Sequence, residues 1–588
     1  MKFLGNVLAV IVGLFVFCIL GFLLMLGLVG ILASTGSEEV TVKENTVLHL
    51  DLNGRTIVER TSEEDLDFSM FGNPFGQEFN AGLVNLKKAI NEAKTNDNIK
   101  GIYLNTGLVI AGQASLLELR NALEDFKTSG KFIIAYDEAY TEGGYYVASA
   151  ADEIYLNPLG GIEYNGFAST GIFFKGLFEK IGVKPEIFRV GEFKSAVEPF
   201  ILEKNSEAAR LQTQSFLDDM NIHSLQSVSD SRGIPFDSLQ AINSKMLVRK
   251  PEDAVTYGLA TELLYLDQVY SKMKEKLGIK EDDDISRINV TDLNSTVKSK
   301  NLTSKNRIAV IIAEGEIVGG EADGVISSEK FAKEIRKARK DDNIKAIVLR
   351  VNSPGGSVVA SEVIWREMSE AEKVKPVIVS MGEVAASGGY YISAPADTIV
   401  AQPNTITGSI GIFGMMFNAQ ELLNQKLGIT TDVVATGELS DFMNPTRPLT
   451  EVERNIIQNT VEDGYETFIS RVSEGRNMTP EAVKEVASGR VWTGNQAKER
   501  GLVDVLGGLD TAIEIAAGKV GAGDDYRVVF LPAKKPWFEM LMEDIGKNVQ
   551  IKLLKNELGE NYYIYQQVQK LKEYSGIQAR MPQEFKIN

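Results

Sequence analysis

The chain contains an internal duplication, so any fold proposed for it must accommodate two similar units. Three pairs of segments recur, the first two at an offset of 245 residues and the third at 243: 96–104 with 341–349, 143–152 with 388–397, and 257–260 with 500–503. A nearly constant offset over this length of chain marks a repeat. The sequence therefore predicts two domains of one architecture.

Each unit alternates strand-like and helix-like segments. In the second unit the strand patterns lie at 308–313, 346–351, 376–380 and 398–401, and the helix patterns lie at 327–340, 358–371 and from residue 389. Strands separated by single helices are typical of parallel βαβ units. The predicted fold class is therefore α/β, with a parallel sheet in each half.

Composition divides the chain into five parts: an anchor at 1–35, a first domain at 36–280, a linker at 281–307, a second domain at 308–525, and an extension at 526–588. The linker is charged, rich in Asn, Ser and Thr, and poor in large apolar residues. The extension begins with a strand pattern at 527–531 and continues with amphipathic helix patterns at 537–555 and 563–574. We interpret the extension as a packing or oligomerisation element.

The N-terminal part is an apolar stretch without charged residues from Phe3 to Ala33. It is longer than the ~20 residues that a helix needs to cross a bilayer. It also exceeds the ~7–15 apolar residues of a secretory signal, which favours an uncleaved anchor, although cleavage near Ala33 stays open. With Lys2 before it and Glu38 and Glu39 after it, the positive-inside rule predicts a single-pass protein of the inner cell membrane whose bulk lies on the periplasmic side.

Composition also excludes several classes of function. With 62 basic and 80 acidic residues, the formal charge of −18 argues against nucleic acid as a partner. The single cysteine, Cys18, leaves no intrachain disulfide and no thiolate metal site. His49 and His223 are the two histidines, which argues against a His-rich zinc site. A Ser-His-Asp triad stays open, but it would have to use one of these two.

Two glycine-rich turns in the second half carry candidate chemistry. Ser387 follows a strand pattern and precedes Gly388-Gly-Tyr-Tyr391, which can begin a helix. A serine at such a turn lies near the positive end of the helix dipole, which favours a developing anion. The turn at Asn352-Ser-Pro-Gly-Gly356 precedes a helix for which Ser357 fits the N-cap, and its glycines let backbone N–H groups point outward. Each turn alone fits a simple connection equally well.

A serine nucleophile needs a base, and histidines are scarce in this chain. Lysine can serve when burial lowers its pKa toward neutrality. Lys194 has an apolar setting, with Phe193, Ala196, Val197 and Phe200 close in sequence. Composition alone does not single it out.

Four motifs together resemble the long, duplicated form of the signal peptide peptidase A (protease IV) family: Gly191–Phe200, Asn352–Gly356, Ala386–Tyr390 and Thr407–Gly411. The resemblance covers nearly the whole chain, including the apolar N-terminus. It implies tandem ClpP/crotonase-like domains, each a superhelix of ββα units, behind an N-terminal transmembrane helix. It further implies a homotetramer that degrades hydrophobic remnant signal peptides.

The resemblance also implies the site. Ser387 matches the nucleophile and Lys194 the general base of a Ser-Lys dyad, and Ser409 matches the serine that orients the lysine. The oxyanion-hole elements match Gly355, Gly356 and Gly388. Neither a metal nor an organic cofactor is implied.

The repeat predicts that neither half holds a complete site. At the offset of 245, Ser387 corresponds to Glu142, and the Pro354–Gly356 turn corresponds to Val109–Ala111. Around the lysine, the second half has Ser440 where the first half has Lys194. Each half thus retains one member of the dyad, and we expect one site per chain, assembled between the halves.

Two other functions remain compatible with these patterns. A crotonase-like enzyme acting on acyl thioesters, a hydrolase or a hydratase, could use the Gly355-Gly356 turn as its oxyanion hole. The anchor and the extracytoplasmic placement argue against acyl-CoA as its substrate. A non-catalytic membrane scaffold could also retain the fold, but the retained dyad argues against it.

Overall fold

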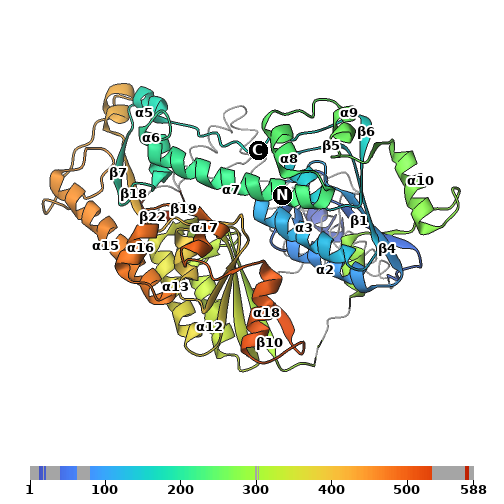
Figure 1. Cartoon of the computed structure of the whole chain (residues 1–588). Coiled ribbons are helices and arrows are strands. Elements are labelled where there is room, and N and C mark those ends of the chain that lie inside the picture. Colours follow the sequence, from blue (N-terminus) through green and yellow to red (C-terminus); the bar gives the residue numbers. More distant parts are fainter. Residues whose placement is uncertain are drawn as a thin grey trace, which may run out of the picture.

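The structure, a computed structural model, describes residues 12–17, 19–21, 40–61, 80–297, 301, 303–532 and 576–581. Figure 1 shows two lobes, one built mainly from the first half (blue to green) and the other mainly from the second half (yellow to red). The long helix α7 (Glu207–Arg232) lies across both lobes (Figure 1). The duplicated sequence therefore folds as two units joined side by side.

The first lobe is built on a parallel sheet. Its strands, in the order of the sheet, are β8 (Glu262–Leu263), β6 (Glu153–Ile162), β5 (Phe132–Tyr140), β4 (Ile99–Asn105), β1 (Thr46–Asp51) and β9 (Arg287–Ile288). Helices α2 (Leu83–Thr95), α3 (Gln113–Lys127) and α4 (Glu142–Ala148) bury apolar residues in the same core. The α/β class predicted from the alternation is confirmed.

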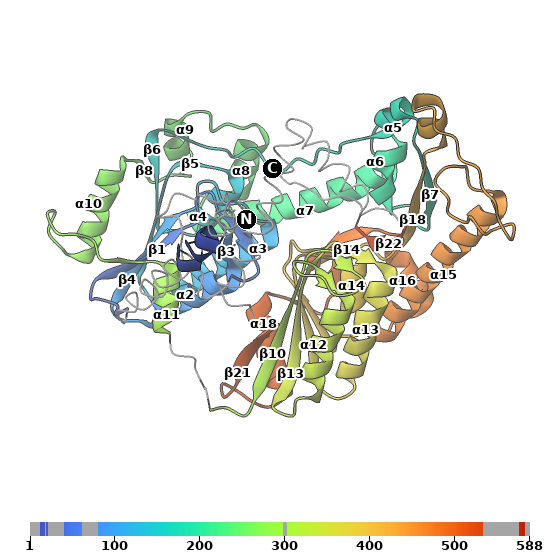
Figure 2. The same ribbon diagram turned by 180° about the vertical axis from the view of Figure 1, so that it is seen from behind.

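The second lobe repeats this plan. Its main path of strands is β19 (Val491–Thr493), β17 (Ile406–Gly408), β15 (Val377–Ala386), β13 (Ile344–Ser353), β10 (Arg307–Glu314) and β21 (Arg527–Leu531). Off this path, β16 (Thr398–Ala401) pairs with β15, and β20 (Val505–Leu506) pairs with β16. Helices α12 (Ser328–Lys340), α13 (Val358–Glu372) and α14 (Gly388–Ser393) lie where helix patterns were expected. Figure 2 shows α12 and α13 alongside β10 and β13.

Helix α12 illustrates why these segments fold as they do. Phe331, Ala332, Ile335 and Ala338 recur at helical spacing and are buried, while the other positions are mostly charged. Such a stripe directs one face of a helix toward the core. The basic residues of its last turn lie at the negative end of the helix dipole, which they stabilise.

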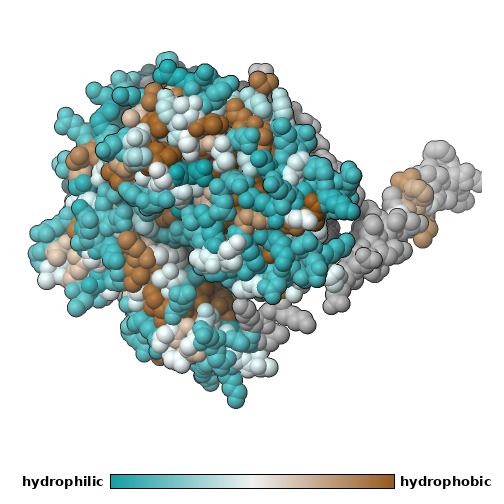
Figure 3. All heavy atoms as spheres, turned by 45° about the vertical axis from the view of Figure 1, so that its right-hand side comes forward, coloured by the Kyte–Doolittle hydropathy of each residue, from teal (hydrophilic) through white to brown (hydrophobic). Residues whose placement is uncertain are grey.

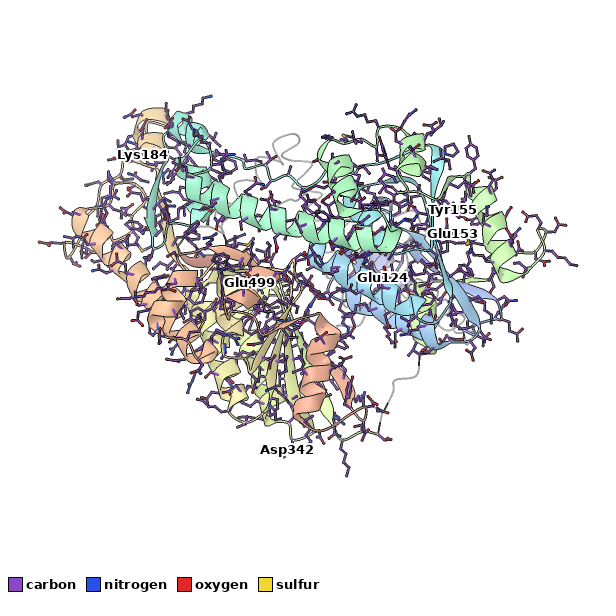
Figure 4. The ribbon with its side chains drawn as sticks, in the orientation of Figure 1. Glu124, Glu153, Tyr155, Lys184, Asp342 and Glu499 are labelled. Atoms are coloured by element: carbon purple, nitrogen blue, oxygen red, sulfur yellow. The ribbon has the colours of Figure 1, made fainter. Side chains whose placement is uncertain are left out.

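One segment of the first half crosses into the second lobe. Strand β7 (Lys184–Arg189) pairs antiparallel with β18 (Phe413–Asn418). Figure 4 shows Lys184 beside the second lobe, whereas Glu153 and Tyr155 lie in the first. The two halves are therefore interleaved, and the segment that follows β7 enters the second lobe.

A third sheet runs through this crossing. Its strands, in order, are β12 (Ile326–Ser327), β11 (Ile317–Val318), β14 (Gly355–Ser357), β22 (Gly576–Arg580), β18 and β7. Strand β22 lies in the C-terminal extension and was not expected from the sequence. The strand expected at 527–531 is present as β21, at the edge of the second-lobe sheet. The two helix patterns expected at 537–555 and 563–574 lie outside the described residues.

Part of the stretch predicted to be a linker, 281–307, forms secondary structure. Within it, β9 pairs with β1, and α11 (Val290–Thr296) packs on the first lobe. Ile288 and Leu293 are buried, and the Asn294 side chain donates to the Asn85 carbonyl at 2.9 Å. A few well-spaced apolar residues are enough to fix this stretch, although its overall composition is that of a linker.

The anchor predicted at 1–35 lies largely outside the described residues. In the parts of the chain that the structure does describe, we find no helix both long and apolar enough to cross a bilayer.

Buried charges join the two lobes. Arg350 on β13 has no exposed surface and lies between two glutamates of the first half. Its Nε donates to Glu59 at 2.8 Å, and its Nη2 forms an ion pair with Glu118 at 2.7 Å that lacks the alignment of a hydrogen bond. Burial alone would raise the pKa of Glu118, but Arg350 and Lys87 outweigh it and lower the pKa to about 2. Buried charges are tolerated when they are paired in this way.

A second contact between the lobes lies beside the first. Glu383 on β15 accepts hydrogen bonds from the backbone N–H groups of Ala114 and Ser115, in the first turn of α3. A carboxylate at a helix N-terminus satisfies otherwise unpaired donors and favours the helix dipole. Both contacts involve strands that end at the glycine-rich turns, so they fix the first lobe to the candidate site.

Replacing Arg350 with Ala is expected to destabilise the protein by about 3–5 kcal/mol, because it removes the guanidinium between two buried carboxylates, Glu59 and Glu118, and leaves Glu118 with Lys87 alone. The measurement is urea unfolding followed by circular dichroism. Arg366→Ala is the matched control, since Arg366 forms an exposed ion pair within α13 and its loss should change the midpoint little. Equal midpoints for the two variants would contradict this role of Arg350.

Candidate active site

Two serines are brought together by neighbouring strands. β15 and β17 run parallel with Ala386 opposite Gly408, so Ser387 and Ser409 follow directly at the same edge of the sheet. The backbone N–H of Ser387 donates to the Gly408 carbonyl at 2.8 Å. The carboxyl ends of parallel strands are where α/β folds most often place ligands.

Ser387 adopts an unusual backbone conformation. Its φ of 55° and ψ of −114° place it in a region that residues other than glycine rarely occupy, and it precedes α14 directly. Gly389 allows α14 to pass closely behind β13, because a Cβ there would lie 2.7 Å from the Ser353 carbonyl. The strand-to-helix turn expected from the sequence is confirmed, and its serine is held in a strained backbone conformation.

Lys194 reaches these serines from the first half. The β7–β18 pairing, with Arg189 opposite Phe413, brings the next residues of the first half beside Ser409. The Lys194 Nζ atom lies 2.8 Å from Ser387 Oγ, 3.0 Å from Ser409 Oγ and 3.0 Å from the Ser409 carbonyl oxygen. All three side chains are fully buried. Residues 193 positions apart thus meet in one site.

Two glycines make room for the lysine. A Cβ at Gly489 would lie 2.7 Å from Lys194 Cβ, and one at Gly411 would lie 3.3 Å from Lys194 Cδ. The backbone N–H of Phe193 donates to the Ser488 carbonyl at 3.0 Å, which holds this segment against the lysine. Sequence reasoning missed Gly489, which belongs to none of the four motifs. Gly411 is the last residue of the Thr407–Gly411 motif, but nothing in the sequence indicated that it packs against Lys194.

Burial lowers the pKa of Lys194 well below its ordinary value of 10.5. No carboxylate in the described part of the chain lies within ion-pair distance of its Nζ atom. Glu198, four residues along, is engaged by Ser206 Oγ at 2.7 Å and by Arg189 at 3.6 Å. A neutral amine has two N–H donors and one lone pair, which matches two contacts to Ser409 and acceptance of the Ser387 hydroxyl proton. The arrangement can therefore take a proton from Ser387.

Gly355 and Gly388 lie next to each other beside Ser387. A Cβ at Gly355 would lie 2.7 Å from the Gly388 nitrogen, and the Gly355 φ of 98° is one that favours glycine. Gly356 follows in β14, where its backbone is pressed against Ile317 of β11. Of the three expected oxyanion-hole residues, the structure brings Gly355 and Gly388 closest together. Gly356 also packs the sheet beside them.

In the first half, the residue that corresponds to Ser387 has different contacts, and the residue of the second half that corresponds to Lys194 is exposed. Glu142, in the place of Ser387, accepts backbone N–H groups of Asn165 at 2.9 Å and Gly166 at 2.7 Å, and the Asn243 side chain at 2.7 Å. Burial raises the pKa of Glu142 above its ordinary value. Ser440, in the place of Lys194, is exposed. Glu142 therefore serves to hold loops of the first lobe.

The histidines lie elsewhere. His49 pairs with the Asn105 side chain at 2.8 Å in the first-lobe sheet, and burial lowers the pKa of His49. His223 lies in α7. Within the described ranges, neither is a hydrogen-bond partner of Ser387. The triad that the sequence left open is not formed by these residues.

Two segments of the chain, residues 125–280 and 369–522, match the model of peptidase family S49. The chain belongs to this family. The repeated match, one segment in each half, agrees with the duplication. "Protease 4" of Salmonella typhi is 39% identical over 80% of this chain and 78% of its own length, and "Protease 4" of Haemophilus influenzae is 34% identical over 91% and 90%. "Serine protease SPPA, chloroplastic" of Arabidopsis thaliana is 31% identical over 86% and 75%.

These similarities extend over most of each protein rather than over one motif. The family and its protease members establish a serine-type endopeptidase.

Lys194→Met should make the protein's stability less dependent on pH. Wild type must keep Lys194 neutral when folded, whereas the unfolded chain binds its proton below 10.5. Between those two pKa values, lowering the pH should cost wild type about 1.4 kcal/mol per unit relative to Lys194→Met. Urea unfolding at about pH 10 and about pH 8 measures the difference.

Lys180→Met, which removes an exposed lysine of α5 (Lys175–Ile181), is the matched control and should show the same small effect at both values. A Lys194→Met effect that is also equal at both values would contradict a neutral buried amine.

Proposed function

We propose that the chain is a membrane-anchored endopeptidase whose catalytic groups are Ser387 and Lys194. The observation that carries the proposal is the 2.8 Å contact between Ser387 Oγ and the Lys194 Nζ atom. The amine is fully buried and its pKa is lowered. A lysine whose pKa is lowered by burial can act as a base, and a serine beside it can become a nucleophile.

The reaction follows from these positions. Neutral Lys194 takes the hydroxyl proton as Ser387 Oγ bonds to the carbonyl carbon of a peptide, and the carbonyl oxygen becomes an oxyanion. We assign the stabilisation of that charge to backbone N–H groups of the turns at Gly355-Gly356 and Gly388. In this structure the Gly355 N–H donates to Ser353 Oγ at 3.2 Å. The carbon–nitrogen bond then breaks, and the protonated Lys194 gives its proton to the leaving amine. A water molecule, deprotonated by Lys194, hydrolyses the acyl ester and restores Ser387.

Ser409 acts through the lysine. Its Oγ and its carbonyl oxygen each lie 3.0 Å from Nζ, so they occupy the two N–H donors of the neutral amine and leave the lone pair for Ser387. Holding a base in one orientation is the role that a third group plays in other serine hydrolases.

Substrate and location form the finer part of the proposal. The uncharged stretch from Phe3 to Ala33 supports an anchor in the inner membrane, with the lobes on the periplasmic side. The resemblance to the signal peptide peptidase A family supports remnant signal peptides and other hydrophobic peptides as substrates.

A homotetramer is also part of the proposal. The segment 427–443 exposes several apolar side chains that a second copy could cover: Leu427, Ile429, Val433, Val434, Leu439, Phe442 and Met443. Figure 3 shows one face on which hydrophobic patches (brown) interrupt a mostly hydrophilic surface (teal). Exposed apolar patches often mark interaction surfaces.

Ser387→Ala should abolish cleavage of a hydrophobic fluorogenic peptide and remove covalent labelling by a fluorophosphonate probe. Lys194→Met should lower turnover by about 10²–10⁴-fold, because the general base is lost. Ser440→Ala, at the exposed repeat counterpart of Lys194, is the control and should retain full activity.

The same assay separates the alternatives. If peptide turnover is unchanged in both Ser387→Ala and Lys194→Met, the chain is better explained as a non-catalytic membrane scaffold. Turnover of an acyl thioester without peptide cleavage would favour the crotonase-like enzyme. Either result would contradict the proposal.

A further inference from the structure

Lys194 lies on a tight turn of the backbone. Its φ of −75° and ψ of 71° are those of an inverse γ-turn, in which the backbone N–H of Ser195 donates to the Phe193 carbonyl at 2.8 Å. A three-residue turn has one internal hydrogen bond, so contacts from outside must fix the direction of its central side chain. That direction matters because the Lys194 Nζ atom meets both Ser387 and Ser409.

The side-chain amide of Gln212, on α7, supplies such contacts. Gln212 is 1% exposed, and its Nε2 atom donates to the Phe193 carbonyl at 3.1 Å and to Ser195 Oγ at 2.9 Å. Its Oε1 atom accepts the backbone N–H of Val491 at 3.3 Å. Two acceptors on one side and a donor on the other fix the orientation of the amide. One side chain therefore holds the residues immediately before and after Lys194.

Val491 belongs to the strand beside Ser409. β19 pairs antiparallel with β17, and Val491 lies opposite Gly408. The residue that follows β17, Ser409, donates its backbone N–H to the Arg490 carbonyl at 2.7 Å. Gln212 thus contacts both the turn that carries the lysine and the strand that holds the serine beside it. Since these come from different halves of the sequence, the amide connects the two halves at the site.

The same face of α7 is also fixed to the second half by other residues. Thr493 Oγ1 donates to Asp219, and the Gln496 side chain donates to Ser215 Oγ at 3.1 Å. Gln212, Ser215 and Asp219 are three and four residues apart, so they lie on one face of the helix. Loss of the Gln212 amide should therefore loosen the Lys194 turn and leave the helix in place.

We propose that Gln212 is a positioning residue for the reaction, which holds the Lys194 turn so that Nζ stays beside Ser387 and Ser409. The proposal rests on the proposed function, in which Lys194 is the base. In this role Gln212 does not touch the substrate, so its loss should lower kcat and leave KM unchanged. A looser turn also admits water to an amine whose pKa is lowered by burial. The rising limb of the pH profile of kcat/KM should therefore move up toward 10.5.

The test uses the full chain and a hydrophobic fluorogenic peptide. Gln212→Met keeps the length of the side chain and removes its hydrogen bonds. Its kcat should fall on the order of 10–100-fold, because a small displacement of a catalytic group is costly, with KM unchanged and the limb at higher pH. Gln214→Met is the matched control, since Gln214 is exposed on the same helix and donates to Asp218 at 2.6 Å. All three values should stay those of wild type.

Two further variants decide the question if Gln212→Met does not fold, as judged by circular dichroism. Gln212→Glu keeps the shape of the side chain, but a carboxylate cannot donate to Phe193 and Ser195, so the limb should again move to higher pH. Ser195→Ala removes one of the two acceptors of Nε2 and should lower kcat about 5-fold, the scale of one neutral hydrogen bond. Added to Gln212→Met, Ser195→Ala should cause no further loss, because the two act through one contact.

A wild-type kcat in Gln212→Met, a rise in KM in place of the fall in kcat, or an unmoved limb in the Gln212 variants that fold would overturn the proposal and make Gln212 a purely structural residue. If neither Gln212 variant folds, a wild-type kcat in Ser195→Ala overturns it. A pH limb that persists in Lys194→Met would instead overturn the proposed function, so the two failures are distinguishable.

Discussion

The burial of one lysine amine against one serine hydroxyl is the contact on which the rest of this structure depends. Among the residues that the structure describes, Lys194 has no ion-pair partner, and desolvation lowers its pKa. Placing an unpaired amine in the interior opposes folding, so the surrounding structure must compensate. The compensation comes from Ser387 and both oxygens of Ser409, and from the close packing of two glycine backbones on the aliphatic stem.

Because the site is divided between the repeats, the interface between the lobes decides whether its residues meet. Lys194 is delivered by the β7–β18 pairing, and the strands that carry the glycine-rich turns are fixed to the first lobe through Arg350 and Glu383. Two lobes that could slide past each other would not hold Nζ within hydrogen-bond distance of Ser387. The first repeat thus supports the chemistry of the second, while its own turn uses Glu142 to hold loops.

Much of this arrangement could be predicted from the sequence, because its signals are local. The strands and helices of the second lobe follow from hydrophobic patterns, and the motifs around Ser387 and Lys194 carry the family resemblance that points to these two residues. What could not be predicted depends on contacts between distant residues. Gly489 matters because it packs on Lys194, β22 exists because β14 and β18 offer it two edges, and residues 287–296 join the first lobe through a few buried side chains. Strand β15 likewise continues beyond Ser380 to Ala386 because β17 pairs with its end.

The pH dependence of kcat/KM on a peptide substrate tests the central claim most directly, since it reports the pKa of the base in the free enzyme. Lys194 must be in its neutral form to act as a base, so activity should rise with pH as the ammonium loses its proton, along a limb centred well below 10.5, the ordinary value for lysine. The limb should be absent from the residual activity of Lys194→Met. Activity that appears only near pH 10 or above, as for a solvated lysine, would contradict the account.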